Sequence, residues 1–114
     1  MAAKDLDLLR GTLDVLILKG LSWAPKHGYA VARWIEETSD GSLQVLDGAL
    51  YTSLHRMEEK GWVEAQWGTS ATGHRAKFYS LTPLGRKQLR SESQSWSDYV
   101  GAVGKILNAT TQPA

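Results

Sequence analysis

The chain has 114 residues, which suits one domain with its own core and leaves little length for a separate catalytic module. It contains no cysteine, which excludes disulfides and thiolate chemistry, and no apolar run of about 20 residues or signal-peptide pattern, so we expect a cytoplasmic protein that does not enter a membrane. The formal net charge is only +1, so total charge alone does not indicate a nucleic-acid partner.

Apolar residues at helical spacing predict a first helix from Asp5 to Leu21. They fall on two stripes, one with Leu6, Leu9, Leu13, Leu16 and Ile17, and the other with Leu8, Val15 and Leu18. One stripe can pack within its own domain, whereas the second would stay in water in a monomer. We therefore expect the second stripe to face another subunit.

Pro25 and Gly28 predict a break after the first helix. A second helix is predicted from about His27 to Thr38, with Val31, Trp34 and Ile35 pointing inward. The segment from Leu43 to Leu46 is short and apolar, and we expect it to be a brief strand that pairs with a later hairpin.

A third helix is predicted after Asp47, because Leu50, Leu54 and Met57 recur at helical spacing and form its buried face. Asp47 is placed to cap the helix and Gly61 to end it. The opposite face carries small, hydrogen-bonding or cationic residues: Gly48, Thr52, His55 and Arg56, flanked by Ala49 and Tyr51. Such a face can enter a DNA major groove, with Thr52 and Arg56 as the first choices for base contacts and the Tyr51 hydroxyl for a phosphate. Tyr51 could instead serve only the core. The alternative is a solvated face with ion pairs such as Arg56 with Glu59.

Two strands joined by a polar turn are predicted from Trp62 to Thr82. The turn region offers groups that can contact phosphate, namely Thr72, His74, Arg75 and Lys77. No carboxylate lies between Ala65 and Ser91, and residues 65–114 hold six Lys/Arg against two Asp/Glu, compared with seven against ten in residues 1–64. Positive charge therefore gathers at this hairpin and after it, although Arg75 and Lys77 could also serve only to protect an exposed strand edge.

Thr82 and Pro83 predict the start of a last helix, as a cap followed by a proline at the first helical position. Its apolar residues keep helical spacing to about Asn108: Leu89, Trp96, Tyr99, Val100, Val103, Ile106 and Leu107. A long helix with such a stripe needs a partner. We therefore expect a DNA-binding part in residues 1–81, a dimerisation helix in residues 82–108 of the same compact unit, and a disordered tail in residues 109–114.

Three segments together resemble the PadR-type transcriptional regulators: LRGTLDVLILKGLS, GALYTSLHRMEEKGWVEAQWG and GHRAKFYSLTPLGRKQL. The similarity covers roughly Leu6 to Leu107. It implies a dimeric winged-helix repressor whose long last helix makes the dimer and which often leaves DNA when a small molecule binds. The wing departs from the family pattern, because His74 and Ala76 interrupt its basic run.

The surroundings of Trp96, SESQSWSDYV, resemble those of a tryptophan that stacks flat aromatic compounds at the dimer centre in one branch of the family. The same resemblance implies a pocket formed by residues of the first and last helices: Asp14, Val15, Leu18, Leu89, Ser93, Trp96 and Val100. Asp14 would favour cationic ligands. The alternative is that Trp96 only fills a dimer interface. Trp67 is more simply a core or hairpin residue.

These observations predict an α+β, mostly helical winged helix-turn-helix protein with an N-terminal helix, a wing hairpin and a long C-terminal helix. The expected function is a homodimeric repressor that binds a near-palindromic operator and is released by a planar aromatic molecule. The alternative is a winged-helix module that binds a protein instead of DNA. An enzyme has the weakest support. Neither a cofactor nor a metal is expected, since His55 could form a metal-binding pair with Glu58 or Glu59 but no third ligand is evident.

Overall fold

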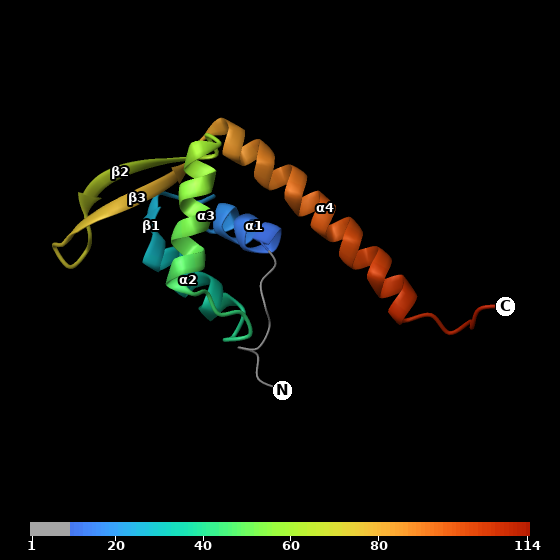
Figure 1. Ribbon diagram of the computed structural model, residues 1–114. Helices are drawn as coiled ribbons and strands as arrows, with labels where there is room; N and C mark the ends of the chain where they lie inside the picture. Colours follow the sequence, from blue (N-terminus) through green and yellow to red (C-terminus); the bar gives the residue numbers. More distant parts are fainter. Residues whose placement is uncertain (1–9) are drawn as a thin grey trace.

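The structure is a computed structural model that describes residues 10–114 (Figure 1). It contains four helices and a small sheet, which confirms the predicted α+β, mostly helical class. The elements in chain order are α1 (Arg10–Gly20), β1 (Lys26–His27), α2 (Gly28–Thr38), α3 (Asp47–Glu59), β2 (Val63–Thr69), β3 (Arg75–Leu81) and α4 (Pro83–Leu107). The predicted start of the first helix at Asp5, together with Leu6, Leu8 and Leu9, lies outside the described residues.

The sheet is antiparallel with strand order β1-β3-β2. Strands β2 and β3 form the predicted hairpin, with Val63 opposite Leu81 and Thr69 opposite Arg75. The third strand is Lys26–His27, so the prediction of a strand at Leu43–Leu46 was wrong. In that segment the backbone amide of Val45 donates a hydrogen bond to Oε2 of Glu36 at 3.1 Å, so this amide bonds a side chain and not the backbone of a neighbouring strand.

The core lies where α1, α2 and α3 meet the base of the hairpin. Its fully buried side chains are Ile17, Leu18, Leu21, Val31, Leu50, Leu54, Met57 and Val63. Leu18 is thus part of its own domain's core, which corrects its predicted place on a stripe facing a second subunit. Val15 is half-buried, and it lies beside α4.

The start of α3 differs from the prediction, whereas its end matches it. Asp47 is the first residue of the helix and not its cap; the capping position is Leu46, which makes no side-chain hydrogen bond. Asp47 still lies where the helix dipole favours a negative charge. Gly61 ends the helix as predicted, because it adopts a φ of +77° and the amide of Trp62 then reaches the carbonyl of Met57 at 2.9 Å.

The start of α4 is fixed to the end of α3 through Thr82 and Gly85. The hydroxyl of Thr82 accepts a hydrogen bond from the Gly85 amide at 3.0 Å, as predicted for a cap, and donates to the carbonyl of Gly61 at 2.6 Å. A Cβ atom at Gly85 would lie 2.0 Å from the carbonyl oxygen of Trp62, so only glycine fits there. The start of α4 is therefore packed directly against the backbone at Trp62.

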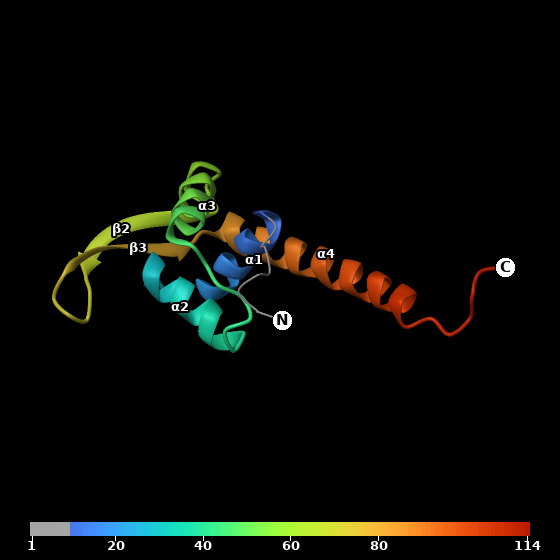
Figure 2. The ribbon, with the colours of Figure 1, turned by 60° about the horizontal axis from the view of Figure 1, so that its bottom comes forward.

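From this start α4 runs 25 residues and projects away from the rest of the domain, as both views show (Figures 1 and 2). The hairpin extends on the opposite side, and the molecule measures 63 × 33 × 21 Å along its principal axes. Residues 109–114 continue beyond the helix without regular structure. Among the helices of residues 10–114, none is both long and apolar enough to cross a membrane.

Candidate nucleic-acid interface

The outer face of α3 presents most of the residues predicted to meet DNA. Gly48, Ala49, Thr52 and His55 are all exposed. Tyr51 is 47% exposed, and a Cβ atom at Gly28 would lie 3.0 Å from its ring, so one side of the ring packs on the first residue of α2. This arrangement leaves part of Tyr51 free for an outside contact, as expected from its place between the buried and exposed faces.

Arg56 differs from its prediction, because its guanidinium is turned toward α1. Its Nη2 lies 2.5 Å from Oδ1 of Asp14 and 3.4 Å from the hydroxyl of Ser53. The Asp14 side chain is only 7% exposed and that of Arg56 23% exposed. In the protomer each group is therefore the other's partner in an ion pair that joins α1 to α3, while the roles of Arg56 in reading bases and of Asp14 in attracting a cationic ligand stay predictions.

The turn of the wing is organised by short polar contacts between its own side chains. The Thr72 hydroxyl lies 3.0 Å from Nδ1 of His74, and the His74 amide donates to the Ser70 hydroxyl at 3.2 Å. Gly73 has a φ of +85°, which suits glycine in a tight turn. Thr72 and His74 are both exposed, so the turn presents hydrogen-bonding groups on a defined loop.

Arg75 and Lys77 lie in strand β3 and not in the loop, and they share one face of the hairpin as strand alternation predicts. The Arg75 guanidinium lies over the Trp67 ring, 4.7 Å from its centre. The Lys77 ammonium lies 5.7 Å from the centre of the Tyr79 ring and 3.7 Å from Oε1 of Glu58. Glu58 thus offsets part of the charge of Lys77, whereas Arg75 has no carboxylate partner among residues 10–114.

A groove of about 720 Å³ separates this face of the wing from α2 and α3. Its walls carry Arg75, Lys77 and five aromatic or imidazole rings: His27, Tyr29, Tyr51, Trp67 and Tyr79. Burial raises the pKa of the Tyr79 hydroxyl above its ordinary value of 10.0, and the nearby charge of Lys77 opposes this shift. The groove therefore brings tyrosine hydroxyls together with two cationic side chains, a combination that suits a phosphodiester strand.

Sequence reasoning missed four of the five rings in this groove: His27, Tyr29, Trp67 and Tyr79. Trp67 could have been found, because the hairpin register places it directly opposite Lys77 and opposite residues share a face. His27 has a second role, since its Nδ1 accepts from the Ala30 amide at 3.2 Å and so caps α2. Its place near the wing follows from the pairing of β1 with β3, which no local pattern indicated.

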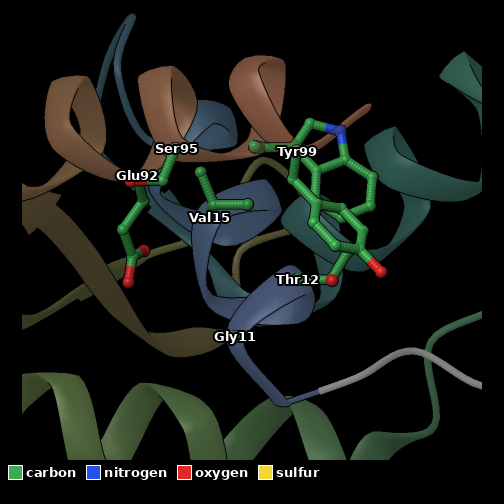
Figure 3. Close-up of a pocket in the computed structure, with 7 residues that line it drawn as sticks. Gly11, Thr12, Val15, Glu92, Ser95 and Tyr99 are labelled. Carbon is green, nitrogen blue, oxygen red and sulfur yellow. The ribbon is translucent and has the colours of Figure 1, made fainter. Parts of the chain in front are cut away.

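A separate hollow of about 330 Å³ lies between α1 and α4 (Figure 3). Two residues of the predicted ligand pocket line it, Val15 and Trp96. The Trp96 ring is 46% exposed, and its centre lies 6.1 Å from that of the Tyr99 ring. The other lining residues were not predicted: Gly11, Thr12, Glu92, Ser95 and Tyr99.

The remaining residues predicted for this pocket lie elsewhere in the protomer. Leu18 is in the core, Leu89 and Ser93 line a different hollow beside Lys19, and Val100 is 48% exposed on α4. The negative group beside Trp96 is Glu92 and not Asp14. Its Oε2 atom is buried and has no hydrogen-bond partner among residues 10–114. The spacing of 92, 96 and 99 already placed these residues on one helix face.

Comparisons with known proteins identify the family. The profile of the PadR-like family of transcriptional regulators matches residues 17–91. Protein X of Lysinibacillus sphaericus is 30% identical over 92 residues, which span 81% of this chain and 84% of that protein. A PadR-like transcriptional regulator of Bacillus cereus has a similar structure, with a TM-score of 0.77 at 27% identity over 90% of this chain and 97% of that one. A transcriptional regulator of Clostridium thermocellum shares the fold, with a TM-score of 0.80 at 24% identity over 90% of this chain and all of that one. The chain therefore belongs to the PadR-like family of transcriptional regulators, and not to a family of enzymes.

Proposed function

We infer that this PadR-like regulator is a cytoplasmic homodimer that represses transcription by binding a near-palindromic operator, and that a planar aromatic molecule releases it. The observation that carries the DNA contact is the exposed, small and polar outer face of α3 beside a wing that contains no carboxylate from Ala65 onward. Gly48 and Ala49 clear the approach of the helix to a major groove, while Thr52 and His55 reach its base edges.

The wing groove supplies the phosphate contacts in this proposal. Arg75 contributes a guanidinium held over Trp67, and Tyr51 contributes a hydroxyl from the other wall of the groove. Lys77 contributes less than a free lysine would, because Glu58 lies 3.7 Å away. We therefore expect the wing to give a modest, salt-dependent share of the binding.

The exposed apolar side of α4 supports the homodimer. Beyond the domain the helix presents Trp96, Tyr99, Val100, Ile106 and Leu107, all of them at least 46% exposed. A monomer would leave this stripe in water, whereas a second copy related by a two-fold axis buries it against its own equivalent. The stripe would also suit a protein partner, and the mass in solution separates the two: a monomer would favour the protein-binding module over the operator-binding repressor.

The hollow beside Trp96 supports ligand release. It is open in the single protomer, and a second α4 across a two-fold axis would cover it. Its aromatic rings suit a flat apolar molecule, and the unpaired Oε2 of Glu92 suits a cationic group on that molecule. Val15 is next to Asp14 in α1, and Asp14 holds Arg56 of α3, so a ligand that shifts α1 would also shift the reading helix.

Binding to a labelled duplex from the protein's own promoter tests the DNA assignment. We expect tight binding that weakens steeply with salt, and equal, weak binding to every duplex would contradict the operator. Arg75→Ala should weaken binding about equally on all sequences. It should also reduce the slope of the logarithm of the binding constant against the logarithm of salt concentration by about one. Lys105→Ala removes the same charge from the far end of α4 and should change neither.

Tryptophan fluorescence tests the ligand. A flat aromatic cation should quench the native chain with a saturable curve and release labelled operator over the same concentration range. Trp96→Ala should lose the saturable quenching, and Glu92→Gln should lose affinity for cationic compounds more than for neutral ones of the same shape. Equal quenching of the native chain and Trp96→Ala by every compound would place the ligand elsewhere.

A further inference from the structure

Leu46 stands at the capping position of α3 but performs no capping. A capping residue is normally Ser, Thr, Asp or Asn, whose side chain accepts a hydrogen bond from an amide of the first turn. The other two helices whose starts have a described cap each have a side chain that accepts such a bond, from His27 on α2 and from Thr82 on α4. Leu46 makes no such bond, and 76% of its surface is exposed.

Nor does the Leu46 side chain serve the core. Val45, just before it, and Leu50, in the first turn of the helix, supply the apolar contact that fixes the entry of the chain into α3. Val45 is 8% exposed and Leu50 is fully buried. They occupy the two positions of a hydrophobic staple, one before the cap and one in the first turn. Single exposed leucines are common, but this one also takes the place of a stabilising cap. Leu46 thus provides neither a cap nor a core contact to the fold, which indicates a function outside the protomer.

We propose that Leu46 reads DNA sequence by contacting the 5-methyl group of a thymine in the major groove. The assignment rests on the proposed function, in which α3 enters that groove. The first residues of a recognition helix are those that meet base edges. Thymine's methyl is the one apolar group on the major-groove edge of the four bases, so it is the feature that an aliphatic side chain can distinguish.

The surroundings of Leu46 favour a base over a phosphate. Asp47 follows it directly, and a carboxylate disfavours a phosphate at this helix end. Gly48 and Ala49 are exposed, and among residues 10–114 a Cβ atom at Gly48 would have no contact within 4 Å outside its own stretch of helix. The start of α3 can therefore approach the floor of the groove closely enough for Leu46 to reach a methyl group.

Replacing thymine by deoxyuridine removes only that methyl group and so tests the contact. The duplex that binds the full-length protein most tightly is first selected from a random library, and each thymine is then replaced in turn. We expect the native chain to lose affinity about fourfold at one thymine in each half-site, the value of one buried methyl group. Leu46→Ala should bind both forms of the duplex equally well.

Leu46→Ser provides the control for folding. Serine can cap α3, so this variant should melt at a higher temperature than the native chain and still lose the distinction between thymine and deoxyuridine. Leu84→Ala removes another exposed leucine, at the start of α4, and should keep the native pattern. The assignment is overturned if the native chain is indifferent to deoxyuridine at every position, or if the Leu46 variants keep the native losses. A selection that yields no preferred duplex would overturn the proposed function, and this assignment with it.

Discussion

Replacing Arg56 by methionine should destabilise the fold markedly, because the carboxylate of Asp14 then stays buried without its cation. The two groups lie 2.5 Å apart, with 7% of the Asp14 side chain and 23% of the Arg56 side chain exposed. Removing one partner of a buried ion pair costs about 3–5 kcal/mol. The guanidinium keeps some contact with water, which weakens the pair, so we expect the low end of that range, about 3 kcal/mol.

Thermal unfolding followed by circular dichroism measures this effect at one fixed protein concentration. Unfolding entropies of about 2.1 cal/mol/K per residue, applied to 114 residues, convert the loss into a fall of roughly 12 °C in melting temperature. Arg75→Met removes an exposed arginine instead and should shift the melting temperature by less than about 2 °C. The double variant Asp14→Leu with Arg56→Met should recover most of the loss, since no charge is then left buried.

A different pattern would refute this reasoning about Arg56. If Arg56→Met melted like the native chain and lost only its preference for the operator, the guanidinium would be reading a base, as the helix periodicity first suggested. If Arg56→Met and Arg75→Met lowered the melting temperature equally, the pair with Asp14 would contribute nothing specific to the fold.

Three further predictions concern the fold. Gly85→Ala should lower the free energy of unfolding by about 3 kcal/mol in urea titrations, because the new methyl group would lie 2.0 Å from the carbonyl oxygen of Trp62. Gly101→Ala in the same helix would have no contact within 4 Å outside its own stretch of helix among residues 10–114 and should not destabilise the fold. Thr82→Ala should cost about 1 kcal/mol in the same titrations through loss of the cap on α4, and an unchanged midpoint would contradict that role. Because the pKa of Tyr79 is raised in the folded state, the folded chain holds this proton more tightly, so stability is complete below about pH 10 and falls as the pH rises further. Tyr79→Phe should therefore lose less stability between pH 9 and pH 11 than the native chain, and parallel losses would contradict the assignment.

Local signals in the sequence were sufficient for the helices and the hairpin. Thr82 with Pro83 marked the start of α4 and Gly61 marked the end of α3, because capping depends on residues only a few positions apart. The exposed face of α3 and the shared face of Arg75 and Lys77 followed from the helical and strand repeats. These repeats are properties of the backbone, and they hold wherever the element lies in the fold.

The tertiary structure decided which charged side chains pair with each other and which segments pair as strands. Arg56 and Asp14 are 42 positions apart, and no local pattern indicates that α1 crosses α3 where their side chains meet. The third strand is another case, since β1 contains only two residues and exists because β3 lies beside it. The sequence thus determined by itself where helices and strands begin, end and expose polar groups, since those features arise from neighbours along the chain. Only the packing decided that Arg56 is bound to Asp14, that Leu18 is in the core and that Val15 of α1 lies beside Trp96 of α4, because burial and charge pairing depend on residues brought together from distant parts of the sequence.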